Sequence, residues 1–364
     1  MLSFALAFTV SLLITLIVIR YAHLHSNLSG DQDLTGVQKF HVRAVPRVGG
    51  IGILLGLVTA ACELQIDYPH ISMAILLLVV CGMPAFLSGL IEDLTKRVSP
   101  LMRLICTMAA ALLAYLLIGA SVSRISVPLF DEALTYPLVA CIVTVLAVAA
   151  LANAVNIIDG FNGLAGMVSF MMFASLAYVA FEVSDPVVLS GSLIMMGAIM
   201  GFFIWNFPAG LIFLGDGGAY FIGFMLGELA ILLVLRHRDV SPWYPVLLFM
   251  YPIFETCFSI YRKKFVRGIS PGIPDGVHLH MLVYKRLMRW AVGSKTAHEL
   301  TRRNSFTSPY LWLLCLIAVI PATLFWRHTL HLFVFVVVFA LTYVWLYLSI
   351  VRFKVPRWMV FRRR

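Results

Sequence analysis

Charged residues are scarce in this chain of 364 residues. They make up 12% of it, whereas about 25% is usual in a soluble domain. Hydrophobic residues make up 61%. So few charges cannot cover the water-facing surface of a globular domain, so the composition excludes a soluble protein and indicates an integral membrane protein.

Several other features are absent. No C-x-x-C pair occurs among the six cysteines, which lie almost entirely in apolar runs and are typical of small buried hydrophobic residues, not of a zinc site or disulfide framework. The alternation of apolar and polar residues that membrane β-strands require is also missing. Without a clear internal repeat, a soluble domain or a low-complexity linker, residues 1–364 are expected to form a single transmembrane domain.

Long apolar runs dominate the chain. A helix needs roughly 20 apolar residues to cross the hydrocarbon, and about eleven runs approach that length. They cover residues 2–20, 48–64, 73–91, 104–121, 137–153, 163–181, 187–205, 217–235, 243–262, 309–326 and 330–351. The sequence therefore predicts an all-α, polytopic integral membrane protein with about eleven transmembrane helices.

Basic residues are distributed unevenly over the predicted connections. With the N-terminus outside, 23 of the 27 lysines and arginines fall on the cytoplasmic side. The positive-inside rule therefore predicts an outside N-terminus and a cytoplasmic C-terminus. This asymmetry explains the net charge of +10 without nucleic-acid binding, for which no motif is present. The basic tail, residues 351–364, is expected to lie against anionic membrane lipids.

Four acidic residues lie where apolar runs meet the predicted inner face: Glu92, Asp93, Asp159 and Asp216. Charges at such depth are costly and usually functional. Ionised carboxylates gathered there would repel one another, and a hard divalent cation such as Mg²⁺ would remove the conflict and favour a phosphate substrate. For any one of them, a helix cap is the competing interpretation.

Glycine-rich stretches and a histidine pair add to this pattern. "DGFNG" (159–163) and "GDGG" (215–218) each precede an apolar run, where backbone N–H groups can approach an anion, although glycines there can equally serve helix packing. His278 and His280 are two residues apart, which is poor spacing for a shared zinc ion on a helix. Because they lie near Arg267 and Lys285 in the sequence, anion binding is the better interpretation, but histidines in loops often have no functional role.

Five stretches, taken together, carry a family resemblance. "KFHVRAVPRVGGIG", "GLIEDLTKRVS", "NAVNIIDGFNGLAG", "FLGDGGAYFIGF" and "SPGIPDGVHLHMLV" occur in this order between Lys39 and Lys285. The chain resembles the polyprenyl-phosphate N-acetylhexosamine-1-phosphate transferase superfamily (glycosyltransferase family 4), in particular its bacterial undecaprenyl-phosphate GlcNAc-1-phosphate transferases. The resemblance implies a catalytic domain whose active site lies in cytoplasmic loops.

The resemblance implies a Mg²⁺-dependent phosphoglycosyltransferase of the bacterial inner membrane, with Mn²⁺ as a substitute ion. It would transfer GlcNAc-1-phosphate from a UDP-sugar to undecaprenyl phosphate and release UMP, as the first membrane step of a cell-envelope polysaccharide such as the O-antigen of lipopolysaccharide. UDP-FucNAc, UDP-QuiNAc and UDP-MurNAc-pentapeptide are the alternative donors, and a homodimer is a further expectation. A secondary transporter is the alternative class, but transporter sites lie near the midplane between repeats.

The matched motifs also imply roles for residues. Asp93, Asp159 and Asp216 are the implied catalytic residues, with Asp216 as the metal ligand. Phe213 would stack on uracil, and Arg267 and the two histidines would clamp the diphosphate. The full implied substrate-binding set is Lys39, His41, Glu92, Arg103, Asn153, Asn156, Gly160, Asn162, Asn206, Phe213, Arg267, His278 and His280.

Three positions depart from the family pattern. Glu92 stands where many members have Asp, and Ala219 replaces a usual Ser. Asn162 stands where several members carry a second Asp, so it can form hydrogen bonds but cannot act as a base.

Overall fold

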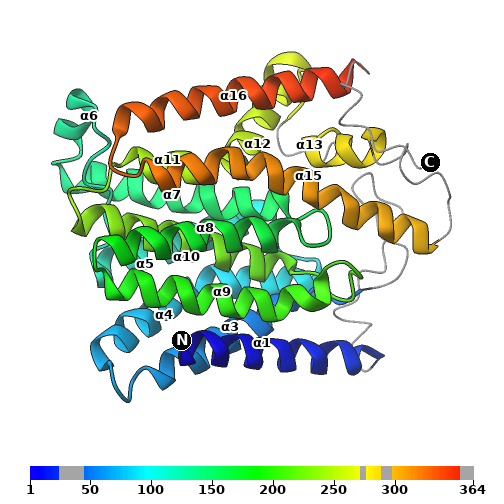
Figure 1. Ribbon diagram of the computed structural model, residues 1–364, viewed down its shortest axis with the longest axis horizontal. Coiled ribbons are helices and arrows are strands. Elements are labelled where there is room, and N and C mark those ends of the chain that lie inside the picture. Colours follow the sequence, from blue (N-terminus) through cyan, green and yellow to red (C-terminus); the bar gives the residue numbers. More distant parts are fainter. Residues whose placement is uncertain (24–44, 271–275, 288–296, 353–364) are drawn as a thin grey trace.

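The computed structural model describes residues 1–23, 45–270, 276–287 and 297–352, and within these ranges the regular elements are helices. Lys39 and His41 lie outside the described residues. Figure 1 shows the long helices running roughly side by side. The α-helices are α1 (Leu2–Arg20), α3 (Gly49–Glu63), α4 (Pro69–Thr95), α5 (Pro100–Ile118), α6 (Pro128–Ala133), α7 (Pro137–Ile158), α8 (Leu164–Glu182), α9 (Pro186–Asn206), α10 (Gly215–Arg236), α11 (Trp243–Leu248), α12 (Met250–Tyr261), α13 (Leu279–Leu282), α15 (Ala297–Leu324) and α16 (Thr329–Val351).

Nine helices in the described part of the chain are long and apolar enough to cross a membrane, and each coincides with a predicted span. The all-helical, multi-pass fold is therefore confirmed. The two remaining predicted spans, 48–64 and 243–262, are also helical but shorter. The first is the 15-residue α3, and the second is divided at Phe249 into α11 and α12.

Proline marks the start of many helices. Pro69, Pro100, Pro128, Pro137 and Pro186 each occupy the first position of α4, α5, α6, α7 and α9. Proline suits this position because it lacks the N–H that a first helical residue leaves unpaired and its φ angle is already helical. The connections before these helices are therefore encoded locally, and they set where each apolar segment enters the bundle.

Helix α10 lies at the centre of the bundle, packed mainly against α4 and α7. Its first turn contacts two neighbours through glycine: Gly217 meets Gly89 of α4, and Gly218 meets Gly50 of α3. A Cβ atom built at either partner glycine would overlap the α10 backbone. These contacts bring three helix backbones together at one end of the bundle, one turn from Asp93.

Two loops join at the same end. The Phe213 N–H donates to the Pro46 carbonyl at 2.9 Å, and the Phe213 carbonyl accepts from the Gly49 N–H at 3.0 Å. Gly215 follows with φ of 78°, and a Cβ atom there would overlap the Arg47 carbonyl, so only glycine fits. The pairing satisfies a free N–H group at the start of α3 and places Arg47 beside the first turn of α10.

Helix α15 differs from the prediction by beginning twelve residues before the expected span at 309. Its polar first part, residues 297–308, lies outside the predicted span. In the structure this part packs against the loop that follows α7, where Ser308 Oγ donates to the Asn162 carbonyl at 2.6 Å and Asn304 Oδ1 accepts from the Asn162 N–H at 2.9 Å. Contacts distant in sequence therefore extend the helix.

The orientation in the membrane stays a prediction with a direct test. In a cysteine-free background, Ser184→Cys and Asp239→Cys should react with an impermeant maleimide in intact cells, because both positions are exposed at the end opposite Asp216. The exposed Ser99→Cys should react only after permeabilisation. The reverse labelling pattern would contradict the predicted orientation, which rests on the distribution of basic residues.

Candidate active site

Asp216 lies in the first turn of α10 and is almost completely buried. Its Oδ2 atom forms an ion pair with Nη1 of Arg103, from the first turn of α5. Its Oδ1 atom accepts a hydrogen bond from Asn156 Nδ2, on α7, at 3.0 Å. Side chains from two other helices thus converge on this carboxylate, and both contacts compensate for its burial.

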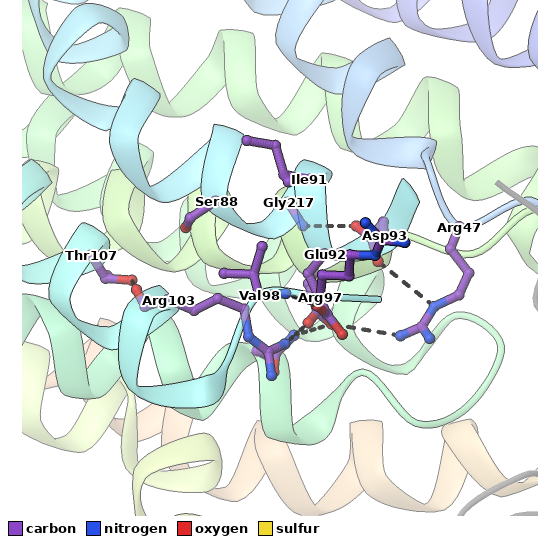
Figure 2. A network of polar contacts seen from close by, with 12 residues as sticks. Arg47, Ser88, Ile91, Glu92, Asp93, Arg97, Val98, Arg103, Thr107 and Gly217 are labelled. Carbon is purple, nitrogen blue, oxygen red and sulfur yellow. Dashed lines mark hydrogen bonds and ion pairs between the residues drawn. The ribbon is translucent and has the colours of Figure 1, made fainter. Parts of the chain in front are cut away.

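Asp93 forms the second acidic centre, near the end of α4, and only 1% of the residue is exposed. Its Oδ2 atom accepts from the Gly217 N–H at 3.0 Å. Arg47 joins the two centres, because its Nε atom lies 3.7 Å from Asp93 Oδ1 and its Nη2 atom 3.6 Å from Asp216 Oδ1. Figure 2 shows Arg47 and Arg103 reaching this group of contacts from different sides. Two carboxylates and two guanidinium groups therefore form one network.

Asp159 ends α7 at the same end of the bundle. Some of its side chain reaches solvent, but the surrounding protein desolvates the carboxylate and raises the pKa of Asp159 to about 7. The positive charge of Arg47 opposes this rise. A carboxyl group with a pKa near neutrality can exchange a proton at physiological pH, which is the property of a general acid or base.

The two histidines lie together beside this loop. Their rings are stacked, with centroids 5.2 Å apart and planes inclined by 4°. His278 Nδ1 lies 2.8 Å from Oε1 of the buried Glu255. His280 is fully buried, burial lowers its pKa to about 3, and neither ring nitrogen has a hydrogen-bond partner among the described residues. A Cβ atom on Gly160 would lie 3.3 Å from His280 Nε2, so the pair adjoins Asp159.

Comparison with known proteins identifies the arrangement. Residues 75–234, which include all three aspartates, match Glycosyl transferase family 4. Over residues 75–234 the chain is a member of glycosyl transferase family 4.

Individual relatives agree with this assignment. The chain is 26% identical over 339 residues, 93% of this chain and 90% of the relative, to a probable undecaprenyl-phosphate N-acetylglucosaminyl 1-phosphate transferase of Bacillus subtilis. An undecaprenyl-phosphate alpha-N-acetylglucosaminyl 1-phosphate transferase of Thermotoga maritima is 31% identical over 30% of this chain and 40% of that protein. A phospho-N-acetylmuramoyl-pentapeptide-transferase of Lactobacillus gasseri is 28% identical over 32% of this chain and 37% of that protein.

The family 4 protein is thus a multi-pass membrane phospho-sugar transferase of the polyprenyl-phosphate HexNAc-1-phosphate type. The substrates of this family are a UDP-sugar and a polyprenyl phosphate. The family match ends at residue 234, so it does not include the histidine pair or Glu255.

Two of the asparagines that the resemblance implies as substrate-binding residues form hydrogen bonds within the fold. Asn206 Oδ1 accepts from the Gly163 N–H at 2.6 Å, and its Nδ2 donates to the Ile212 carbonyl at 2.7 Å. Asn162 is also buried, and its Nδ2 donates to Ser305 Oγ at 3.2 Å. Both side chains hold loops in place, which spacing in the sequence could not distinguish from ligand binding.

The other implied residues are placed as follows. Glu92 Oε2 accepts from the Val98 N–H at 2.8 Å and so closes the turn between α4 and α5. Asn153 donates to the Ala149 carbonyl of its own helix at 2.8 Å. Phe213 is half-buried in the loop paired with Pro46, and Arg267 is exposed after α12. The structure therefore brings Arg103 and Asn156 to the aspartates, but not Glu92 or Asn153.

Sequence reasoning missed two charged residues of this region. Arg47 lies within the quoted stretch "KFHVRAVPRVGGIG", yet nothing in the sequence indicates that it bridges Asp93 and Asp216. Glu255 lies within the apolar run 243–262. The cost of burying a charge, which singled out the other acids, would have found it as well.

Metal coordination at this site would depend on few protein ligands. No three His, Cys, Asp or Glu side chains within them form a group that could hold a metal. Mg²⁺ nevertheless needs only one or two carboxylates, with phosphate oxygens and water completing its shell. Asp93 Oδ1 is buried without a hydrogen-bond donor among the described residues. Asp93 and Asp216 therefore fit Mg²⁺ in donor chemistry, provided that the ion displaces a present partner of Asp216.

A matched pair of substitutions separates fold from site. Asn206→Ala leaves the buried Gly163 N–H unsatisfied, so the free energy of unfolding should fall by about 1–3 kcal/mol and the melting temperature should fall with it. Asn156→Ala should leave the melting temperature nearly unchanged but slow sugar-phosphate transfer, because it removes a contact to Asp216. Thermal unfolding and UMP release measured on both variants test this assignment. A strong stability loss confined to Asn156→Ala would contradict it.

Proposed function

We propose that the enzyme transfers GlcNAc-1-phosphate from UDP-GlcNAc to undecaprenyl phosphate and releases UMP, as the first membrane step of a cell-envelope polysaccharide such as an O-antigen. The observation that carries the chemistry is the Arg47–Asp93–Asp216–Arg103 network at one end of an apolar bundle. One reactant is soluble and the other is in the bilayer, so the reaction needs charged groups at such an interface. The names of the relatives from B. subtilis and T. maritima support GlcNAc as the sugar.

Mg²⁺ is the proposed cofactor, held by Asp216 with Asp93 nearby. When bound, the ion would neutralise charge on the diphosphate and favour the leaving of UMP. Arg47 and Arg103 pair with the carboxylates in the structure. Arrival of a diphosphate would offer these guanidinium groups a stronger anion, so they can orient it.

Direct attack by the lipid phosphate is the proposed reaction. A phosphoryl transfer of this kind depends on alignment and on neutralising charge. If the lipid phosphate arrives as a monoanion, Asp159 is suited to accept its proton because its pKa is about 7. The buried His280 is neutral near pH 7, so it would contribute a hydrogen bond and not a positive charge.

A panel of radiolabelled UDP-sugars with undecaprenyl phosphate tests the proposed substrate. UDP-GlcNAc should give Mg²⁺-dependent UMP release and a labelled lipid, whereas UDP-FucNAc, UDP-QuiNAc and UDP-MurNAc-pentapeptide should react more slowly. Faster UMP release from one of these three donors would show that the proposed sugar is wrong.

Asp216→Asn should reduce the transfer rate at least about a hundredfold, a few kcal/mol of transition-state stabilisation. The substitution keeps the size of the side chain but removes the charge that would hold Mg²⁺. UDP-GlcNAc binding without Mg²⁺ should change little, and the Mg²⁺-dependent part of binding should vanish. Near-normal UMP release by the well-folded variant would place the metal elsewhere, with Asp93 and Glu92 as the next candidates.

The pH dependence of kcat/KM should report Asp159. If the carboxylate form is required, kcat/KM should rise with pH, reach half its maximum near pH 7, or at lower pH where Mg²⁺ stabilises the charged form, and level off above that. Arg47→Gln should move this rise to higher pH, because Arg47 favours the charged form of Asp159. The residual activity of Asp159→Asn should lack the rise, and an unchanged profile in that variant would assign the proton to another group.

A further inference from the structure

Glu255 is a fully buried carboxylate on α12 that makes three polar contacts to two other parts of the chain. Its Oε1 atom lies 2.8 Å from His278 Nδ1 and 3.3 Å from the Leu279 N–H, which donates to it. Its Oε2 atom accepts from the Tyr343 hydroxyl of α16 at 2.7 Å. One acidic side chain therefore links α12, the histidine segment and the α16 helix.

These contacts determine the state of His278. An ionised carboxylate can only accept hydrogen bonds, so the His278 proton must be on Nδ1, and the tautomer and ring orientation follow from Glu255. The Leu279 N–H contact holds the backbone between His278 and His280. Since the two rings are stacked, the orientation of the first limits the position of the second.

The histidine pair in turn meets the loop after α7. His280 lies against Gly160, with Phe161 packed edge-on against its ring at a centroid distance of 5.6 Å. The nitrogens of His280 are buried and accept or donate no hydrogen bond within the described chain. Burying a polar ring unsatisfied costs free energy, which a ligand can recover by bonding to it. Gly160 directly follows Asp159.

We infer that Glu255 is a positioning residue. It holds His278 and His280 against the Asp159–Gly160 loop, where the two histidines contact the phosphate groups of the bound substrate. This inference rests on the proposed function, because it assigns the histidines to that reaction. Glu255 itself is fully buried and acts through His278, without contacting the substrate. Tyr251 and Tyr347 also interact electrostatically with Glu255, and Arg262 interacts with its partners His280 and Tyr343.

Glu255→Gln is the central variant, because it keeps the shape but removes the charge and replaces one of the two acceptor oxygens, which serve His278 and Tyr343, by an NH₂ donor. Its kcat for UMP release should fall at least about tenfold, more than its KM for the UDP-sugar changes. Glu255→Asp should recover part of the loss because it keeps the charge. Tyr343→Phe removes one donor from the carboxylate and should lower kcat by a smaller factor, which provides a second test if Glu255→Gln folds poorly.

Glu228→Gln is the matched control. Glu228 is an equally buried carboxyl group, in α10, whose oxygens have no hydrogen-bond partner within the described ranges. Its neutralisation should leave kcat close to that of the unsubstituted enzyme. A fall in kcat for Glu228→Gln as large as for Glu255→Gln would show a general effect of buried charge and would overturn the assignment.

¹⁵N-histidine NMR of the full-length protein in nanodiscs supplies a readout that does not need turnover. The His278 signal, assigned with His278→Ala, should show an Nδ1–H tautomer whose ¹⁵Nδ1 chemical shift changes in Glu255→Gln, because the charged acceptor is lost. An unchanged His278 signal in Glu255→Gln, or normal kcat per folded molecule in both Glu255→Gln and Tyr343→Phe, would overturn the inference. If the unsubstituted enzyme releases no UMP from any UDP-sugar while the His278 signal still depends on Glu255, the proposed function fails and the contact stands.

Discussion

The neutralisation of carboxylates at the end of an apolar bundle is the constraint on which the site depends. Asp93 and Asp216 are nearly inaccessible to water, so their charges must be compensated locally. Arg47 and Arg103 supply positive charge, and Asn156 and the Gly217 N–H supply hydrogen bonds. These partners are also groups that bind phosphate, so an anionic substrate and a cation can exchange with them without leaving a charge unpaired.

Glycine makes this concentration of charge feasible. At Gly50, Gly89, Gly217 and Gly218 the backbones of α3, α4 and α10 come into direct contact. The same contact places Asp93 within hydrogen-bonding distance of the first turn of α10. A larger side chain at these positions would separate the helices, and the two aspartates could no longer share Arg47.

The polar residues at this end of the molecule have two kinds of task. The side chains of Asn206 and Asn162 satisfy backbone groups of the loops between α7 and α8 and between α9 and α10. Asp216, Asn156 and Arg103 instead contact one another in a network that a substrate can enter. The histidine pair is held by Glu255 through His278 and lies adjacent to Gly160 through His280.

The apolar runs alone determined that the chain is an all-helical membrane protein, because a segment of this length and composition has no other stable state in lipid. The rule that charges are costly at membrane depth also singled out Glu92, Asp93, Asp159 and Asp216 as candidates without a structure. The partners of these residues depend on contacts between segments far apart in the chain. Arg47 with Asp93, Asn206 with Gly163, and Glu255 with His278 and Tyr343 were decided only by tertiary packing, since no local pattern records which side chains helix packing brings within hydrogen-bonding distance.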